Sequence, residues 1–245
     1  MFNFIVRIAG QSVGVTANFE STKNFCRDYL CDGEADFSVA ISMEDIAFER
    51  EKSAREDALE GLPIRNHSDA YLETLAVQRK ITERLFNHDI LLFHGSVIAV
   101  DGVGYLFTAK SGTGKSTHTR LWRQTFGDRA IMVNDDKPFL RIGEDGIMAC
   151  GTPWMGKHGL GANIAVPLKA ICILQRGEEN RIERISAKDA VLMILQQSSR
   201  PQQAKNMAKY LELIDKLAAG TAFYKLWCNM TPEAAEVAFE RMNQE

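Results

Sequence analysis

The stretch LFTAKSGTGKSTHTRLWR at residues 106–123 constrains this chain more than any other, because it contains SGTGKST, most of a phosphate-binding loop. The full pattern G-x-x-x-x-G-K-[ST] places a glycine five residues before Gly114, where this chain has Ala109. An apolar run at 102–109 predicts a strand that enters the loop, and STHTRLWRQTF predicts a helix that leaves it. A strand, loop, helix order of this kind is what a nucleotide-binding α/β core requires.

Each position of the loop has its own role toward a polyphosphate. Gly112 and Gly114 leave backbone N–H groups open, and the positive end of the following helix favours anionic oxygens. Lys115 adds a cation for the β and γ phosphates, and the hydroxyl of Ser116 can hold Mg²⁺. Ala109 adds only one methyl group at the turn out of the strand. The predicted nucleotide site consists of Ser111, Gly112, Thr113, Gly114, Lys115, Ser116 and Thr117.

A second chemical element, Asn134-Asp135-Asp136, ends an apolar strand predicted at 131–136. In a parallel sheet the strand ends lie beside the phosphate loop, so a carboxylate there can reach a metal ion directly or through water. Two adjacent carboxylates can divide the work, one holding the metal while the other accepts a proton from an attacking hydroxyl. Neighbouring residues of a strand point to opposite sides, so both face the phosphates only if the chain turns at this pair.

The remaining sequence predicts two lobes. The first, residues 1–88, is an α+β lobe with a hairpin at 3–17, a strand at 38–44, a charged connection at 47–67 and a helix from Ser68 to about Asn87. The second, residues 89–245, contains strands at 90–100, 102–109, 131–136, 168–176 and 223–228 and a mostly helical C-terminal third. The glycine-rich stretch 151–163, with Lys157-His158, is either a mobile loop over the site or a structural turn with Trp154 in the core.

Composition excludes several classes of function. The chain has 245 residues, of which 45% are hydrophobic, and no apolar run approaches the roughly 20 residues that cross a bilayer. No basic region precedes the apolar patch at the start, so we expect no secretory signal and a cytoplasmic location. Lys and Arg total 29 against 32 Asp and Glu, which argues against nucleic acid as a partner. The five cysteines lack metal-ligand spacing, and we expect reduced thiols.

Three motifs occur in an order that resembles the kinase core of the HPr kinase/phosphorylase family, and more distantly phosphoenolpyruvate carboxykinase. They are His94-Gly95, the loop at 111–116 and Asp135-Asp136. The resemblance covers about residues 90–180, and a looser similarity to HPr-kinase-related proteins of biosynthetic clusters extends to the C-terminus. It implies a PEP-carboxykinase-like P-loop kinase core. Together with the strands and helices predicted above, this leads us to expect an α/β fold with an N-terminal β-rich lobe and a helical C-terminal part.

The resemblance also implies roles for individual residues. Asp135 would be the catalytic base, Asp136 and Ser116 would hold Mg²⁺, and His94, at the end of a strand beside the one that feeds the loop, would lie near the transferred phosphate. Lys115 would neutralise charge on that phosphate. Residues 1–88 do not match the family's N-terminal domain and Ala109 replaces a glycine, so phosphorylase activity and a hexamer do not carry over.

The sequence therefore predicts a kinase that uses ATP and Mg²⁺ to phosphorylate a hydroxyl, with a serine of a protein or peptide as the first candidate. A small-molecule hydroxyl kinase and a non-catalytic nucleotide-sensing module remain as alternatives. Both carboxylates favour catalysis, because sensing requires no base. We expect no membrane partner, and a homo-oligomer remains open.

Overall fold

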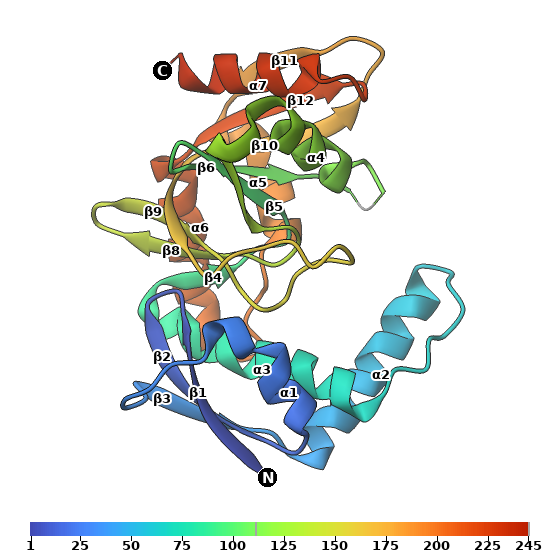
Figure 1. The fold of residues 1–245 in the computed structure, drawn as a ribbon, viewed down its shortest axis with the longest axis vertical. Coiled ribbons are helices and arrows are strands. Elements are labelled where there is room, and N and C mark those ends of the chain that lie inside the picture. The colour runs from blue at the N-terminus through green and yellow to red at the C-terminus, as the bar shows by residue number, and fades with distance from the viewer. Residues whose placement is uncertain (111, 245) are drawn as a thin grey trace. The chain divides into compact units, whose positions relative to one another are not determined.

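The computed structural model describes residues 1–110 and 112–244, and the chain divides into two compact units, Met1–Arg84 and Leu85–Glu245 (Figure 1). The sequence analysis placed this boundary between residues 88 and 89. No helix of the described residues combines the length and the apolar character that crossing a membrane requires. The chain is a mixed α/β protein, and each unit is described by itself.

The first unit combines a small sheet with helices. Its strands are β1 (Phe2–Ile8), β2 (Gln11–Ala17) and β3 (Phe37–Ala40), in the order β1-β2-β3. Its helices are α1 (Glu20–Phe25), the 3-10 turn η1 (Arg27–Tyr29), α2 (Met43–Leu59) and α3 (Asp69–Leu85). β1 and β2 form the antiparallel hairpin expected at 3–17, and β3 adds to β2 in parallel.

Helix α2 occupies much of the segment expected to be a charged connection, so that expectation was wrong. The helix begins with a capping box, in which the backbone N–H of Asp45 donates to Ser42 and that of Ser42 donates to Asp45 at 2.9 Å. It lacks a clear apolar period because two of its buried residues, Glu49 and Asp57, are acidic. The unit therefore contains more helix than the β-rich lobe expected from the sequence.

The second unit is built on one extended sheet. Its strands are β4 (Ile90–Leu92), β5 (Ser96–Val100), β6 (Val103–Thr108), β7 (Ala130–Asn134), β8 (Phe139–Gly143), β9 (Gly146–Cys150), β10 (Ala165–Arg176), β11 (Arg181–Ile185) and β12 (Ala222–Cys228). They pair in the order β4-β8-β9-β10-β6-β5-β7, and β12 pairs with both β10 and β11. Its helices are α4 (Lys115–Phe126), α5 (Ala187–Gln197), α6 (Met207–Gly220) and α7 (Glu233–Asn243), with 3-10 turns η2 (Phe86–His88), η3 (Gly127–Arg129) and η4 (Ala204–Asn206).

Strand direction brings the predicted motifs to one edge of this sheet. β6, β10 and β12 run parallel, whereas β5 is antiparallel to both β6 and β7. β6 and β7 therefore point the same way, and their carboxyl ends share an edge with the amino end of β5. The sheet is mixed rather than parallel, yet it places the strand ends as expected.

The strand predicted at 90–100 is two strands. The chain leaves the sheet between β4 and β5, where the N–H of His94 donates to Gln197 O at 2.7 Å and that of Gly95 donates to Asp136 O at 3.0 Å. His94 therefore precedes β5 instead of ending a strand. An apolar run alone could not reveal this break, because the residues on both sides of it are buried.

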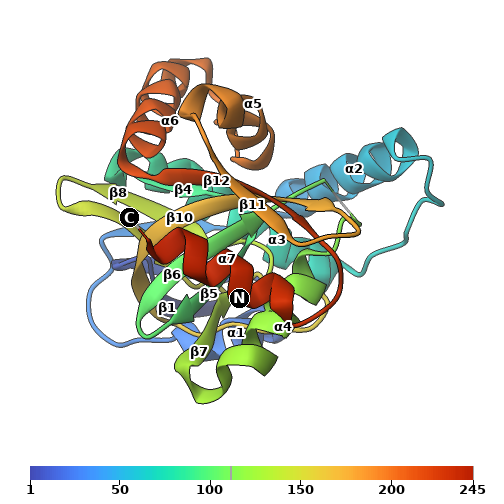
Figure 2. The same cartoon turned by 90° about the horizontal axis from the view of Figure 1, so that it is seen from above.

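Helices cover both faces of the sheet, as Figure 2 shows. Alternate residues of β10 separate into two cores: Ile171 and Ile173 pack with residues of α5 and α6, while Cys172 and Leu174 pack with residues of α4 and α7. This period of two is that of a strand buried on both sides. β6, which enters the loop before α4, is divided in the same way, with Leu106 in the first core and Tyr105 and Phe107 in the second.

Candidate functional site

The loop between β6 and α4 exposes backbone at the start of a helix. Gly112 has φ of 76° and Gly114 has φ of 123°, conformations that favour glycine. A Cβ atom at Gly112 would meet nothing within 4 Å, so the backbone there is open to a ligand. Gly114 precedes α4 without a side-chain cap, which leaves the first N–H groups of the helix available to an anion.

The loop pattern includes two further positions, Ser111 and Ala109. Ser111, predicted as part of the nucleotide site, lies outside the described residues. Ala109 is fully buried and its φ is not positive, so the position does not require glycine. This geometry explains why alanine can replace the first glycine of the motif.

Arg176, at the end of β10, holds the loop from the neighbouring strand. Its Nη2 donates to Gly112 O at 2.6 Å, and its Nε reaches Thr113 O at 3.5 Å. The sequence analysis missed this residue. The available signal was its position as the last residue of a strand predicted at 168–176, because parallel strand ends meet at one edge.

Asn134 shapes the turn that carries the two carboxylates. Its side chain is fully buried, and its Oδ1 accepts the N–H groups of Asp136 at 2.8 Å and Lys137 at 2.6 Å. Its Nδ2 donates to Thr152 O at 3.1 Å, which fixes the amide from the other side. The predicted turn is therefore present, and it is an Asx turn that ends β7.

The two carboxylates lie in different surroundings. Asp135 is 6% exposed, and burial raises the pKa of Asp135 above its ordinary value although the N–H of Gly156 donates to its Oδ1 at 2.6 Å. Burial also raises the pKa of Asp136, but the hydrogen bond from His94 and nearby lysines lower it more, so the net shift is downward. The environment thus separates an acid that binds a proton more readily from one that stays ionised.

His94 contacts the second carboxylate, with 3.1 Å between its Nε2 and Oδ1 of Asp136. The hydrogen bond to Asp136 raises the pKa of His94, but burial and two nearby lysines outweigh it, and the pKa lies below the ordinary value. At neutral pH the contact is a neutral imidazole donating to a carboxylate. Lys115 lies close enough to Asp136 for the carboxylate to act on it, although burial lowers the pKa of Lys115 overall.

The glycine-rich segment 151–163 wraps the end of β7. A Cβ atom at Gly151 would lie 1.9 Å from Ala162 O, so only glycine fits this approach. Trp154 is buried, as the structural reading of this segment expected. Lys157 and His158 are exposed and line a cavity, so the segment has a structural half and a half that faces the site.

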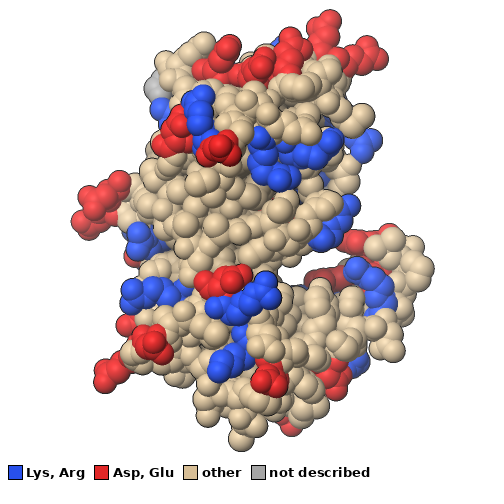
Figure 3. All heavy atoms as spheres, in the orientation of Figure 1, with Lys and Arg blue, Asp and Glu red and all other residues tan. Residues whose placement is uncertain are grey.

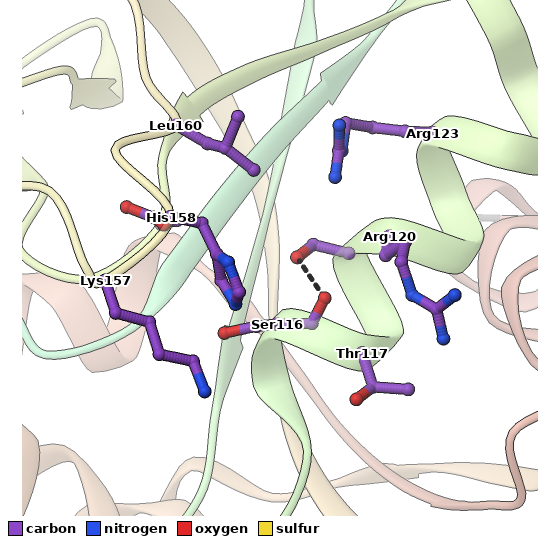
Figure 4. A pocket seen from close by; sticks show the side chains of 9 residues that line it. Ser116, Thr117, Arg120, Arg123, Lys157, His158 and Leu160 are labelled. Atoms are coloured by element: carbon purple, nitrogen blue, oxygen red, sulfur yellow. Dashed lines mark hydrogen bonds between the residues drawn. The ribbon is translucent and has the colours of Figure 1, made fainter.

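The cavity between this segment and α4 has a volume of about 500 Å³. Figure 4 shows Ser116, Thr117, Arg120 and Arg123 on the helix and Lys157, His158 and Leu160 on the facing segment. Thr119 and Asp135 complete the lining. Basic side chains also gather over α4 in Figure 3. The sequence analysis did not single out the two arginines, although their spacing from Ser116 places all three on one helix face.

The geometry fits a nucleotide with a metal ion. The open loop offers N–H donors for phosphate oxygens, and Ser116 and the carboxylates offer the oxygen donors that Mg²⁺ prefers. Among the described residues no group of three or more His, Cys, Asp or Glu side chains forms a metal site by itself. A Mg²⁺ ion here would depend on phosphate oxygens and water for its remaining ligands, which is usual for this ion.

The profile of one protein family, described as SynChlorMet cassette protein ScmC, matches residues 63–234. No curated protein matches the chain significantly. Among solved structures, the chain is similar to the Hpr(Ser) kinase/phosphatase from Coxiella burnetii, at 12% sequence identity and a TM-score of 0.35. That similarity covers 61% of this chain and 95% of the other, and it is a distant one. The family match includes the loop, the arginines of α4 and both carboxylates.

Proposed function

This chain belongs to the family of the SynChlorMet cassette protein ScmC, and we propose that it is an ATP- and Mg²⁺-dependent kinase. It would transfer the γ-phosphoryl group to a hydroxyl, with a serine of a protein or peptide as the acceptor. The main support for the proposal is the pair Asp135 and Asp136. Their pKa values shift in opposite directions, and they lie beside an open loop at the start of a helix. A turn with a purely structural role requires neither an open loop beside it nor two carboxylates with opposite pKa shifts.

The loop residues would bind the phosphates of ATP. Gly112, Thr113 and Gly114 present the backbone, and Lys115 adds a positive charge next to the transferring group. Arg176 would keep the loop in its binding conformation through the two loop carbonyls. When bound, Mg²⁺ supplies charge neutralisation for the phosphate oxygens, and Ser116 and Asp136 would hold it.

Asp135 would act as the general base. In the proposed step the acceptor oxygen forms a bond to the γ phosphorus, and the bond from that phosphorus to the bridging oxygen of ADP breaks. The hydroxyl proton goes to Asp135, whose raised pKa suits an acceptor of protons. Gly156 orients the carboxylate by its hydrogen bond to Oδ1.

His94 would act as a positioning residue in this scheme. Its hydrogen bond holds Asp136 in place and helps to keep that carboxylate ionised. Asp135, and not Asp136, lines the cavity together with Ser116. Asparagine variants of the two carboxylates therefore test whether their roles are exchanged.

The decisive experiment incubates the protein with ATP, Mg²⁺ and candidate acceptors and measures the gain of one phosphate by mass spectrometry. Serine-containing peptides and free hydroxyl compounds are tested side by side, which separates a peptide kinase from a small-molecule kinase. Binding of Mg²⁺–ATP without transfer to any acceptor and without hydrolysis would instead favour the non-catalytic nucleotide-sensing module. Absence of Mg²⁺–ATP binding would overturn the proposal.

A further inference from the structure

We propose that the acceptor is anionic and carries a carboxylate close to the hydroxyl that receives the phosphoryl group. The inference rests on the proposed function, because the cavity that suggests it adjoins the same loop and Asp135. We assign the carboxylate to an acidic residue that neighbours the acceptor serine in a peptide. A free hydroxy acid offers the same chemistry, and the test below separates the two sources.

One face of α4 connects the phosphate loop to the basic cavity. Ser116, Arg120 and Arg123 follow a spacing of four and three residues, so they lie in one row along the helix. The opposite face carries His118, Leu121 and Trp122, which are buried in the core. The row is therefore free to face the cavity, and both arginines line it.

The facing segment adds positive charge to the same space. Lys157 and His158 line the cavity opposite the arginines, as Figure 4 shows. Asp135 is the one carboxylate among the described residues that line the cavity, and burial raises its pKa. In the described part of the chain, the cavity is thus lined by three basic side chains, Arg120, Arg123 and Lys157, and by one acid, Asp135, which we assign to the reaction.

The side chain of Arg123 contains a buried hydrogen-bond donor without an acceptor in residues 1–110 and 112–244. Its Nε lies out of contact with solvent and meets no hydrogen-bond acceptor among the described residues. A buried donor without an acceptor is destabilising, so such groups are rare in native proteins. In Figure 4 the side chain extends from α4 toward the facing segment. A carboxylate bound in the cavity would give this donor an acceptor and pair with the guanidinium.

Distances favour the acceptor over the nucleotide as the occupant. A helix rises 1.5 Å per residue, so Arg120 lies about 6 Å and Arg123 about 10 Å beyond Ser116 along the axis. The β and γ phosphates bind at the loop and the first helical turn, short of these positions. Side chains two residues apart on an extended peptide are about 7 Å apart, which is of the same order as the rise from Ser116 to Arg120 and Arg123 along the helix.

The test uses synthetic peptides of equal length with one central serine, flanked by aspartates, asparagines or lysines, together with glycerate as a free hydroxy acid. Initial rates give KM and kcat, and calorimetry with a non-hydrolysable ATP analogue and Mg²⁺ measures peptide binding independently of transfer. We expect the aspartate peptide to bind most tightly. Arg123→Gln should raise its KM by about 10-fold, the loss typical of one charged hydrogen bond, and should leave the asparagine peptide unchanged.

Charge reversal makes the test sharper. Arg123→Glu should invert the preference, so that the lysine peptide binds better than the aspartate peptide. Arg129→Gln is the matched control, because Arg129 pairs with the exposed Asp101 at the opposite edge of the sheet. It should leave all KM values as in the wild type.

The outcomes separate this inference from the proposed function. Equal affinity for the three peptides, or a loss of Mg²⁺–ATP binding in Arg123→Gln with no effect on peptide, overturns the anionic acceptor while transfer to a serine still supports the kinase. Selective binding of the aspartate peptide without transfer supports the anionic site and overturns the kinase. Preference for glycerate over every peptide supports the carboxylate and overturns its assignment to a peptide.

Discussion

Nε2 of His94 lies 3.1 Å from Oδ1 of Asp136, so this histidine engages the second carboxylate of an adjacent pair and leaves Asp135 to face the cavity. Burial raises the pKa of Asp135, whereas the hydrogen bond from His94 and nearby lysines outweigh burial at Asp136 and lower its pKa. In enzymes with two carboxyl groups, environments that separate their pKa values allow one to act as acid or base while the other stays ionised.

The two carboxylates should respond differently to the same substitution. Asp136→Asn should weaken Mg²⁺–ATP binding and turnover together, because an amide lacks the charge that a hard cation favours. Asp135→Asn should retain Mg²⁺–ATP binding and lose on the order of 10²–10⁴-fold in turnover, the usual contribution of a general base. Calorimetry and a transfer assay measure both. Weak binding in Asp135→Asn with normal binding in Asp136→Asn would reverse the roles, and full activity in both would overturn the kinase.

Lys115→Ala should abolish most nucleotide-dependent activity and preserve the fold. The ammonium group belongs to the first residue of α4, beside the open loop, where in the proposed kinase it would neutralise phosphate charge. Turnover and the thermal unfolding midpoint are the two readouts. Lys188→Ala, an exposed lysine of α5, is the control and should match the wild type in both. Wild-type turnover in Lys115→Ala contradicts the loop assignment.

Ala109→Gly should affect stability more than binding. The position is buried and needs no positive φ, so glycine would add backbone freedom to the unfolded chain without improving the loop. We expect a loss of roughly 0.5–1 kcal/mol in unfolding free energy and an unchanged Kd for Mg²⁺–ATP. Denaturant unfolding and calorimetry check both values. A large loss of affinity would show that the methyl group takes part in binding.

Arg176→Gln should loosen the phosphate loop. The guanidinium bonds to two loop carbonyls, and a glutamine amide is too short to reproduce both contacts. We expect the Kd of Mg²⁺–ATP to rise by about 10-fold and amide exchange to increase in the segment 112–116, while kcat at saturation changes little. Unchanged exchange and affinity would mean that Arg176 does not position the loop.

His118 should make stability depend on pH. Its side chain is 2% exposed, Trp122 donates to its Nε2 at 2.9 Å, and burial lowers the pKa of His118 to about 3. An unfolded histidine takes a proton near pH 6.5, so below that pH the unfolded state binds more protons than the folded state. The unfolding free energy should therefore fall as pH decreases toward 3, by up to about 1.4 kcal/mol per pH unit from this group.

His118→Gln should reduce this pH dependence. Glutamine keeps an acceptor near Trp122 and does not titrate. The unfolding free energy of the variant should therefore lack the pH dependence, equivalent to about one proton, that His118 contributes between about pH 6 and pH 4. Urea unfolding at a series of pH values measures it. His158→Gln, at an exposed position, serves as the control and should retain the wild-type slope. An equal pH dependence of the unfolding free energy in the wild type and His118→Gln would show that His118 is not its source.

The sequence alone was sufficient for those features that depend on neighbouring residues. The apolar run before SGTGKST and the helical pattern after it correctly predicted β6 and α4. The hairpin of the first unit was predicted for the same reason. Such elements follow from local periodicity and turn chemistry, which a short window contains.

Tertiary structure decided the features that depend on distant residues. Helix α2 escaped prediction because its buried Glu49 is neutralised by Arg79, a partner on another helix. Three further features require strands and loops that meet only after folding. They are the hydrogen bonds from Arg176 to the loop, the unequal surroundings of Asp135 and Asp136, and the shared cavity of Lys157 and Arg123. Local sequence sets backbone preference, whereas burial, pKa and the convergence of charges depend on which remote segments pack together.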